Sequence, residues 1–294
     1  MPIALTNSIN MAFETFGNPE DTCLVLIMGL GEQMVAWPDN FCRILAYNGF
    51  FVVRLDNRDA GLSSKFDACG IPDLNKAWAF YYNDTPITSP YTLKDMAADV
   101  KGLLDWLKIE KVVVCGFSLG AMIAQNMAFA FPDRMIGMVC MGSSTGARGL
   151  PAPSAEAQTV MASPPPQSRE DYIDHATSIF KAFSGGSLLY DKKCRAEIAA
   201  LSFDRCFYPQ GFMRQSVAML ADGSRKKRLE SIQLPTLVLQ GELDPIAQIE
   251  HGLAIRDAVP NASFSIISKW GHGLDYPEIW PQLIRKINDW AETI

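Results

Sequence analysis

The chain has few histidines and no cysteine pairs of the kind that hold metals. Three histidines occur in 294 residues, so a reaction that needs an imidazole has few candidates. The seven cysteines are odd in number and scattered, and none stands in a C-x-x-C pair, which argues against a zinc site and a disulfide framework. We therefore expect that the protein binds no metal. We expect its cysteines to be free thiols in a reducing cytoplasm, with Cys115 and Cys140 buried in apolar runs.

The chain also lacks a basic balance and a long apolar run. Its net charge of −6 argues against a nucleic-acid surface. The one basic run, Arg225–Arg228, is predicted to be the exposed side of a short helix. No apolar run reaches the roughly 18 residues that span a bilayer, and the N-terminus does not resemble a signal peptide. We expect no nucleic-acid partner, no membrane span and a cytoplasmic location.

What the chain has is a regular alternation of apolar strands and amphipathic helices. The expected strands are residues 3–7, 10–17, 22–30, 50–56, 111–117, 135–143, 235–241 and 262–268. The expected helices are residues 41–49, 92–109, 118–131, 247–259 and 278–294, with a capping box at Thr92 and Asp95. This order predicts an α/β fold with a mostly parallel central sheet and helices on both faces.

One long segment interrupts the alternation. Residues 144–233 open with "TGARGLPAPSAEA", contain "SPPPQS" and then continue with helical stretches such as "REDYIDHATSIFKAF". A structureless loop of this length is improbable in a compact domain, so we expect an inserted helical cap. The core domain would then comprise residues 1–143 and 234–294. The aromatic segment "AFYYNDTP", residues 79–86, is expected either to pack on the cap or to close a pocket rim.

The stretch "KVVVCGFSLGAMIAQ" places Ser118 between Gly116 and Gly120, where a buried strand ends and a helix begins. A G-x-S-x-G sequence in this context indicates a sharp, strained turn that exposes a nucleophilic serine. The glycines leave room for close backbone packing, and the hydroxyl stands at the carboxyl edge of the sheet. The alternative is that Ser118 only caps the helix, since serine is a favoured N-cap.

A serine hydroxyl needs a base, and His272 is the histidine placed to serve. It follows the last expected strand, so it lies at the same sheet edge as Ser118. His175 falls in the expected cap, and His251 is mid-helix, where we expect a solvated face.

The imidazole needs a carboxylate that fixes its tautomer. Asp244 follows the penultimate strand and is the expected acid, with Glu242 and Asp275 as rivals. Asp275 is better explained as a cap that, with Glu278, starts the last helix. The chain order serine, acid, histidine is that of α/β-hydrolases.

These residues and the segments "LIMGLGEQMVAWPDNFC", "RLDNRDAGLSS" and "PTLVLQGELDPIA" resemble the α/β-hydrolase family, particularly its aclacinomycin methylesterase branch and related cofactor-free esterases. The resemblance covers nearly all of the chain except the cap, and it implies no cofactor. Where the family usually has His-Gly, this chain has Met28-Gly29. The resemblance assigns the oxyanion hole to the backbone N–H groups of Leu30 and Leu119.

The turn "DNRDAGLS" resembles the Asp-x-Arg-Gly-x-Gly-x-Ser turn of the same family, with Asp59 in place of its first glycine. We expect Asp56 and Arg58 to hold this turn beside the oxyanion loop and to take no part in the chemistry. A serine nucleophile argues against the dehalogenase and epoxide-hydrolase branches, which use aspartate.

The sequence thus predicts a serine esterase for small to medium apolar carboxylic esters, with water as the second substrate. An apolar pocket is expected from the residues that flank the motifs, namely Met34, Trp37, Phe117, Trp270 and Leu274. A carbon–carbon bond hydrolase or a cofactor-free perhydrolase with the same triad, and a ligand receptor with slow turnover, stay open. The oligomeric state also stays open, with a homodimer as one option.

Overall fold

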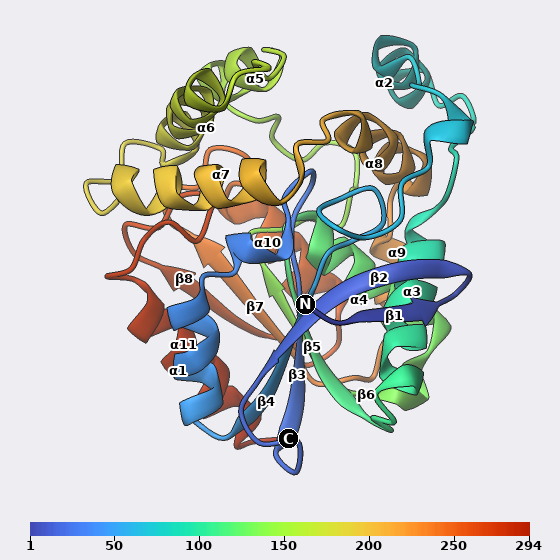
Figure 1. Cartoon of the computed structure of the whole chain (residues 1–294). Helices are drawn as coiled ribbons and strands as arrows, with labels where there is room; N and C mark the ends of the chain where they lie inside the picture. Colours follow the sequence, from blue (N-terminus) through green and yellow to red (C-terminus); the bar gives the residue numbers. More distant parts are fainter.

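A computed structural model describes residues 1–294 and is built around one eight-stranded sheet (Figure 1). The strands are β1 Ile3–Thr6, β2 Ile9–Phe16, β3 Thr22–Ile27, β4 Phe50–Leu55, β5 Val112–Phe117, β6 Met135–Met141, β7 Thr236–Gly241 and β8 Ser263–Ile267. Their order across the sheet is β1-β2-β4-β3-β5-β6-β7-β8. Strands β3 to β8 run parallel, while β1 and β2 are antiparallel additions at one edge. The prediction of a mostly parallel sheet is confirmed.

Helices cover both faces of the sheet. The helices are α1 Asp39–Tyr47, α2 Leu74–Tyr82, α3 Leu93–Trp106, α4 Leu119–Ala130, α5 Ala155–Met161, α6 Arg169–Phe183, α7 Lys192–Cys206, α8 Gln210–Asp222, α9 Lys226–Leu229, α10 Ile249–Ala258 and α11 Trp280–Ala291. Short 3-10 turns occur at Met34–Ala36, Asp67–Cys69 and Pro132–Arg134. The predicted capping box of Thr92 and Asp95 opens α3. None of these helices combines the length and apolar character that a membrane crossing requires.

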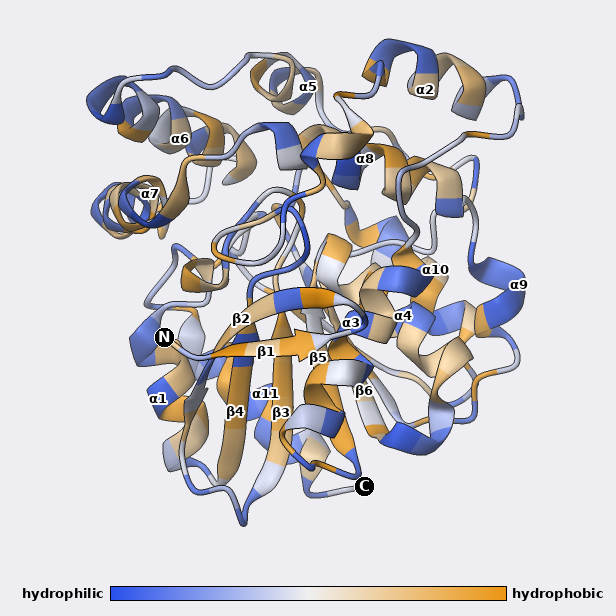
Figure 2. Cartoon of the chain, turned by 45° about the vertical axis from the view of Figure 1, so that its right-hand side comes forward, coloured by the Kyte–Doolittle hydropathy of each residue, from blue (hydrophilic) through white to orange (hydrophobic).

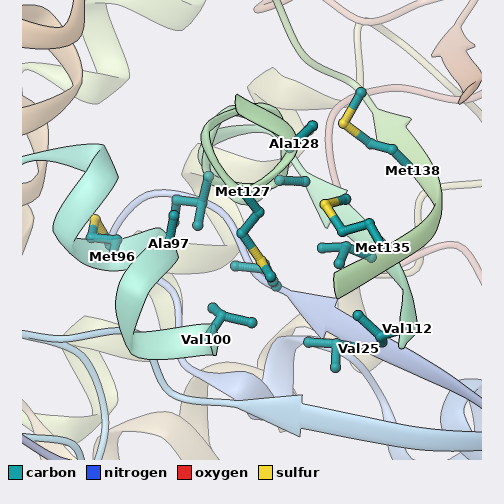
Figure 3. Packing of buried hydrophobic residues seen from close by; sticks show 14 of the residues in the cluster. Val25, Met96, Ala97, Val100, Val112, Met127, Ala128, Met135 and Met138 are labelled. Carbon is teal, nitrogen blue, oxygen red and sulfur yellow. The ribbon is translucent and has the colours of Figure 1, made fainter. Parts of the chain in front are cut away.

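Two apolar layers lie between the sheet and its helices. One layer joins β3, β5 and β6 to α3, α4 and α10, and Figure 3 shows Ala97 and Val100 of α3 on the side toward Met127 of α4, above Val25 and Val112. The other joins the opposite face to α1 and α11. Figure 2 shows orange, apolar stretches along β3 and β4. Because both faces are covered, the central strands β3, β5 and β6 read as nearly continuous apolar runs in the sequence.

The segment between β6 and β7 is largely helical. Figure 1 shows α5, α6, α7 and α8 above the carboxyl edge of the sheet, with α2 near α8. Ala77 of α2 packs on Val217 and Leu220 of α8, so the helix that contains the first half of "AFYYNDTP" packs against the segment expected to be the cap. By contrast, Leu229 of α9 and the nearby Ile232 belong to the core layer. The helices above the sheet edge therefore end before residue 233.

Two local expectations need correction. Helix α11 begins at Trp280 without a side-chain cap, so Asp275 and Glu278 do not frame its start. Asp275 is instead buried, and Glu278 is exposed. In the basic run, Lys226 and Lys227 are exposed as predicted, but Arg225 is fully buried. Its guanidinium donates to Gln125 Oε1 at 2.7 Å and to Asp222 Oδ2 at 2.7 Å, and these acceptors replace water.

The cysteines are free thiols, and Cys115 and Cys140 are buried as predicted. Burial raises the pKa of Cys140 to about 12, because the thiolate has little solvation there.

Candidate active site

Ser118 stands on a strained turn between β5 and α4. Its backbone angles are φ 52° and ψ −117°, a conformation that non-glycine residues rarely adopt. The side chain makes no capping hydrogen bond to its own helix, so the alternative of a plain N-cap is not supported. The backbone carbonyl accepts a hydrogen bond from Ser143 Oγ at 2.8 Å, which fixes the turn from β6. The hydroxyl is thus free for another partner.

The glycines beside this serine make the close turn possible. A methyl group at Gly116 would overlap the backbone of Gly120, and one at Gly120 would overlap the carbonyl oxygen of Ile27. Helix α4 therefore starts in direct contact with the end of β3. This packing also brings Gly29 next to Ser118, since a Cβ at Gly29 would lie 3.3 Å from Ser118 Cβ.

His272 lies beside Ser118, in the loop after β8. Its Nε2 is 3.2 Å from Ser118 Oγ and its Nδ1 is 2.7 Å from Asp244 Oδ2. An ionised carboxylate only accepts hydrogen bonds, so Nδ1 carries the proton and Nε2 presents its lone pair to the serine hydroxyl. The ring is buried and packs on Phe117, with ring centroids 4.8 Å apart.

Asp244 is oriented by the loop that follows β7. Its Oδ1 accepts hydrogen bonds from the backbone N–H groups of Ile246 and Ala247, each at 2.8 Å. This leaves Oδ2 directed at His272. The three residues named from the sequence are therefore joined in one hydrogen-bonded series at the carboxyl edge of the sheet.

The two rival acids lie elsewhere. Glu242 is exposed and accepts from Ser268 Oγ and the Lys269 N–H, and these hydrogen bonds lower the pKa of its carboxyl. Asp275 is buried without a partner for Oδ2, and desolvation raises its pKa to about 7. Neither carboxylate forms a hydrogen bond with His272.

The other two histidines are not part of this series. His175 lies on α6, and neither of its ring nitrogens is hydrogen-bonded. His251 was expected on a solvated face, and this is wrong. Its Nδ1 is 2.8 Å from Ser144 Oγ and its Nε2 is 2.9 Å from the Pro151 carbonyl, so the side chain ties α10 to the segment after β6.

One expected oxyanion donor lies in the loop after β3, and the other lies at the start of α4. Leu119 is the first residue of α4, and Leu30 follows Gly29, which lies against the serine. Neither N–H has a hydrogen-bond partner. The first N–H groups of a helix are free for an anion, and the helix dipole adds a partial positive charge there.

The turn after β4 holds this loop. Asp56 Oδ1 accepts from the Met34 N–H at 2.7 Å, and Asn57 Nδ2 donates to the Met28 carbonyl at 3.0 Å. Arg58 does not contact the loop through its side chain and pairs with Asp99 of α3 at 2.6 Å. Asp56 thus holds the oxyanion loop as predicted, and Asn57, which the sequence did not single out, holds it too, while Arg58 holds the turn to α3.

The residues expected to line a pocket are largely core residues. Met34, Trp37 and Trp270 are fully buried, so none of them lines an open pocket. Trp37 packs on Phe41 of α1, and Trp270 donates its indole N–H to the Gly273 carbonyl at 2.7 Å. The expectation is corrected for these three. Leu274 is likewise buried, in the layer that contains α1 and α11. Phe117 precedes Ser118 and packs on His272, so it lies next to the site.

Sequence reasoning missed the contacts that reach the site from residues 144–233. The Phe183 carbonyl, at the end of α6, accepts from the His272 N–H at 2.8 Å. Arg195 of α7 forms a bidentate ion pair with Glu32, two residues after Leu30, at 2.9 and 3.1 Å. No local sequence signal marks these partners, because more than 80 residues separate the members of each pair.

Comparison with known proteins agrees with this fold. A family profile described as alpha/beta hydrolase fold matches residues 22–274. Rhodomycin D methylesterase DauP from Streptomyces sp. strain C5 is 26% identical over 91% of this chain and 90% of its own length. A 2-hydroxy-6-oxononadienedioate/2-hydroxy-6-oxononatrienedioate hydrolase from Pseudomonas putida is 28% identical over 67% of this chain and 68% of its own.

A solved structure shows the same fold. The enol-lactonase from Burkholderia xenovorans LB400 superposes with a TM-score of 0.75 at 18% identity, covering 99% of this chain and all of the other. The profile match over most of the sequence, together with this architecture, shows that the chain belongs to the α/β hydrolase fold family.

Proposed function

We propose that this protein is a serine hydrolase that cleaves small to medium apolar carboxylic esters through an acyl-enzyme on Ser118. The observation that carries the proposal is the series Ser118 Oγ, His272 Nε2, His272 Nδ1 and Asp244 Oδ2, with separations of 3.2 and 2.7 Å. A nucleophile within hydrogen-bond reach of a base that a third group orients is the arrangement that nucleophilic catalysis requires.

The reaction follows from these roles. Ser118 Oγ attacks the ester carbonyl carbon while its proton moves to His272 Nε2, and the imidazolium is stabilised by Asp244. The C–O bond to the alcohol breaks, and His272 returns the proton to the leaving alcohol. Water then attacks the acyl-enzyme, again deprotonated by His272, and releases the carboxylic acid with Ser118 restored.

The tetrahedral oxygen formed in both steps needs donors. The N–H groups of Leu30 and Leu119 are the proposed pair, because both flank Ser118 and neither is engaged elsewhere. Donors held in place before the charge develops are often the largest catalytic contribution. The helical segment above them, residues 144–233 in our division of the chain, is proposed to select the substrate as a cap.

The similarity to a methylesterase supports an ester as the substrate. The test is a series of aryl esters with increasing acyl length beside a series of methyl esters. We expect turnover in both series, abolished in Ser118→Ala, and covalent labelling of Ser118 by a fluorophosphonate. Labelling that persists in Ser118→Ala would show that another residue attacks.

A carbon–carbon bond hydrolase with the same triad is the second candidate. The similarity to the Pseudomonas putida hydrolase, whose name gives a dioate as its substrate, favours it. Turnover of such a dicarboxylate with no turnover of any ester in the two series would establish this alternative.

A further inference from the structure

The loop that carries the Leu30 donor is held by side chains from the helices above the sheet. Gly31 N–H, adjacent to Leu30, donates to Gln215 Oε1 of α8 at 2.9 Å. Gln33 Nε2 donates to the carbonyls of Ser202 and Cys206 at the end of α7, at 2.7 and 2.8 Å. The residues that follow Leu30 are thus fastened to α7 and α8, while its own N–H is free.

Gln215 has a double role in this arrangement. The side chain is fully buried, and while Oε1 accepts from Gly31, Nε2 donates to the Arg58 carbonyl at 2.8 Å. Arg58 belongs to the same turn as Asn57, which holds the Met28 carbonyl on the other side of Leu30. One amide therefore joins α8, the turn after β4 and the oxyanion loop.

Packing at Gly31 strengthens this link. Its φ of 73° lies in the left-handed region, and a Cβ there would lie 2.8 Å from the Phe212 ring of α8. The backbone thus approaches α8 closely enough for its N–H to meet Gln215. No other acceptor is bonded to this N–H, so its direction depends on Gln215.

We infer that Gln215 is a positioning residue of the oxyanion hole, which directs the Leu30 N–H at the developing oxyanion through its hydrogen bond with Gly31. The inference rests on the proposed ester hydrolysis and adds that α8 contributes to the chemistry as well as to substrate selection. A hydrogen bond one peptide unit from the donor controls the orientation of that donor, and a misplacement of about 1 Å can lower a rate about 100-fold.

The test is Gln215→Met, which keeps the length of the side chain and removes both hydrogen bonds. With an aryl acetate, we expect kcat to fall about 10- to 100-fold, less than the roughly 100- to 1,000-fold loss on removal of a whole oxyanion donor, with KM within about twofold. Inhibition by an alkyl trifluoromethyl ketone, which forms an anionic adduct with the serine, should weaken by the same factor as kcat/KM. Gln215→Asn is the second variant, because its shorter amide keeps a polar group in the site and cannot span both partners.

Ser216→Ala is the matched control. Ser216 is the next residue of α8, it is buried, and its hydroxyl donates only to the Phe212 carbonyl of its own helix. We expect wild-type kcat and ketone inhibition from this variant. If both Gln215 variants keep wild-type kcat, or lose kcat without weaker ketone inhibition, Gln215 does not position the oxyanion hole.

Ser118→Ala, measured in parallel, separates this inference from the proposed function. Wild-type ester turnover by Ser118→Ala would overturn the proposed function. An inactive Ser118→Ala beside fully active Gln215 variants would overturn only the role of Gln215.

Discussion

At the scale of single residues, two carboxyl groups near His272 have opposite surroundings. Asp244 accepts hydrogen bonds from two backbone N–H groups and from the imidazole, and these donors stabilise a carboxylate beside His272. Asp275, three residues after His272, is buried with one oxygen unpartnered. Two acids with such different environments should differ both in their effect on the rate and in their effect on stability.

We expect Asp244→Asn to lower kcat by about four orders of magnitude, because an amide stabilises the wrong imidazole tautomer. Asp275→Asn should keep kcat within about tenfold of wild type, because Asp275 forms no hydrogen bond with His272. Steady-state hydrolysis of an aryl ester at neutral pH measures both. A larger loss in Asp275→Asn than in Asp244→Asn would reverse the assignment of the acid.

Asp275 should also make stability depend on pH. Burial raises its pKa from 3.8 to about 7 in the folded protein, so the folded state binds more protons than the unfolded state between these values. The contribution of protonated Asp275 to the free energy of unfolding is therefore fully present below pH 3.8 and is lost as pH rises through about 7. The free energy of unfolding of Asp275→Asn, relative to wild type, should increase by a few kcal/mol between pH 5 and pH 8.

Urea unfolding of both proteins at several pH values gives that difference. A difference that does not change with pH would mean that Asp275 titrates alike in the folded and unfolded chains.

At the scale of elements, the contact between α4 and the end of β3 fixes the site. Gly120 allows the first turn of the helix to lie on the Ile27 carbonyl, and this contact sets the distance from Ser118 to the oxyanion loop. The strain at Ser118 is of the order of 1–3 kcal/mol for such a backbone. It persists because the close backbone packing at Gly116 and Gly120 leaves the turn no space in which to relax.

We expect Gly120→Ala to destabilise the protein by about 1–3 kcal/mol and to lower turnover at least about tenfold, because the added methyl separates α4 from β3. Thermal unfolding and an ester assay measure the two effects. Gly49→Ala is the control, since Gly49 has a φ of 89° and no heavy atom within 4 Å of an added Cβ. That variant should lose about 1–2 kcal/mol from left-handed strain and keep its turnover. Equal turnover in both variants would contradict the role of the α4–β3 contact.

At the scale of the whole molecule, the predicted core and the predicted cap, residues 144–233, are not independent of each other. The three residues proposed for the triad and both proposed oxyanion donors lie outside residues 144–233. Nevertheless the His272 N–H is held by Phe183, and the oxyanion loop by α7 and α8. These hydrogen bonds join the two parts.

The ion pair of Arg195 and Glu32 joins these two parts and can be tested by a double-mutant cycle. Arg195 is buried, so Glu32→Gln leaves an uncompensated cation and should cost roughly 3 kcal/mol of unfolding free energy. Arg195→Met should cost a similar amount, and the double variant at least about 1 kcal/mol less than the sum. Urea denaturation provides the three values, and additive costs would show that the two charges do not interact.

The sequence alone determined the strands, their order of alternation with helices and the strand–serine–helix turn, because these depend on neighbours a few residues apart. It also pointed to Ser118, Asp244 and His272, since each follows a strand of a parallel sheet and such strands end at one edge. The structure brings all three into one hydrogen-bonded series.

Only the tertiary structure decided which side chains are buried and which distant partners they meet. Trp37 and Trp270 flank the motifs in sequence but pack in the core, and Asp275 is buried instead of capping α11. His251 and Gln215 bind groups more than 100 residues away, which no helical or strand periodicity encodes. Periodicity reports which face of an element is apolar, whereas the identity of a polar partner depends on how the faces of several elements meet.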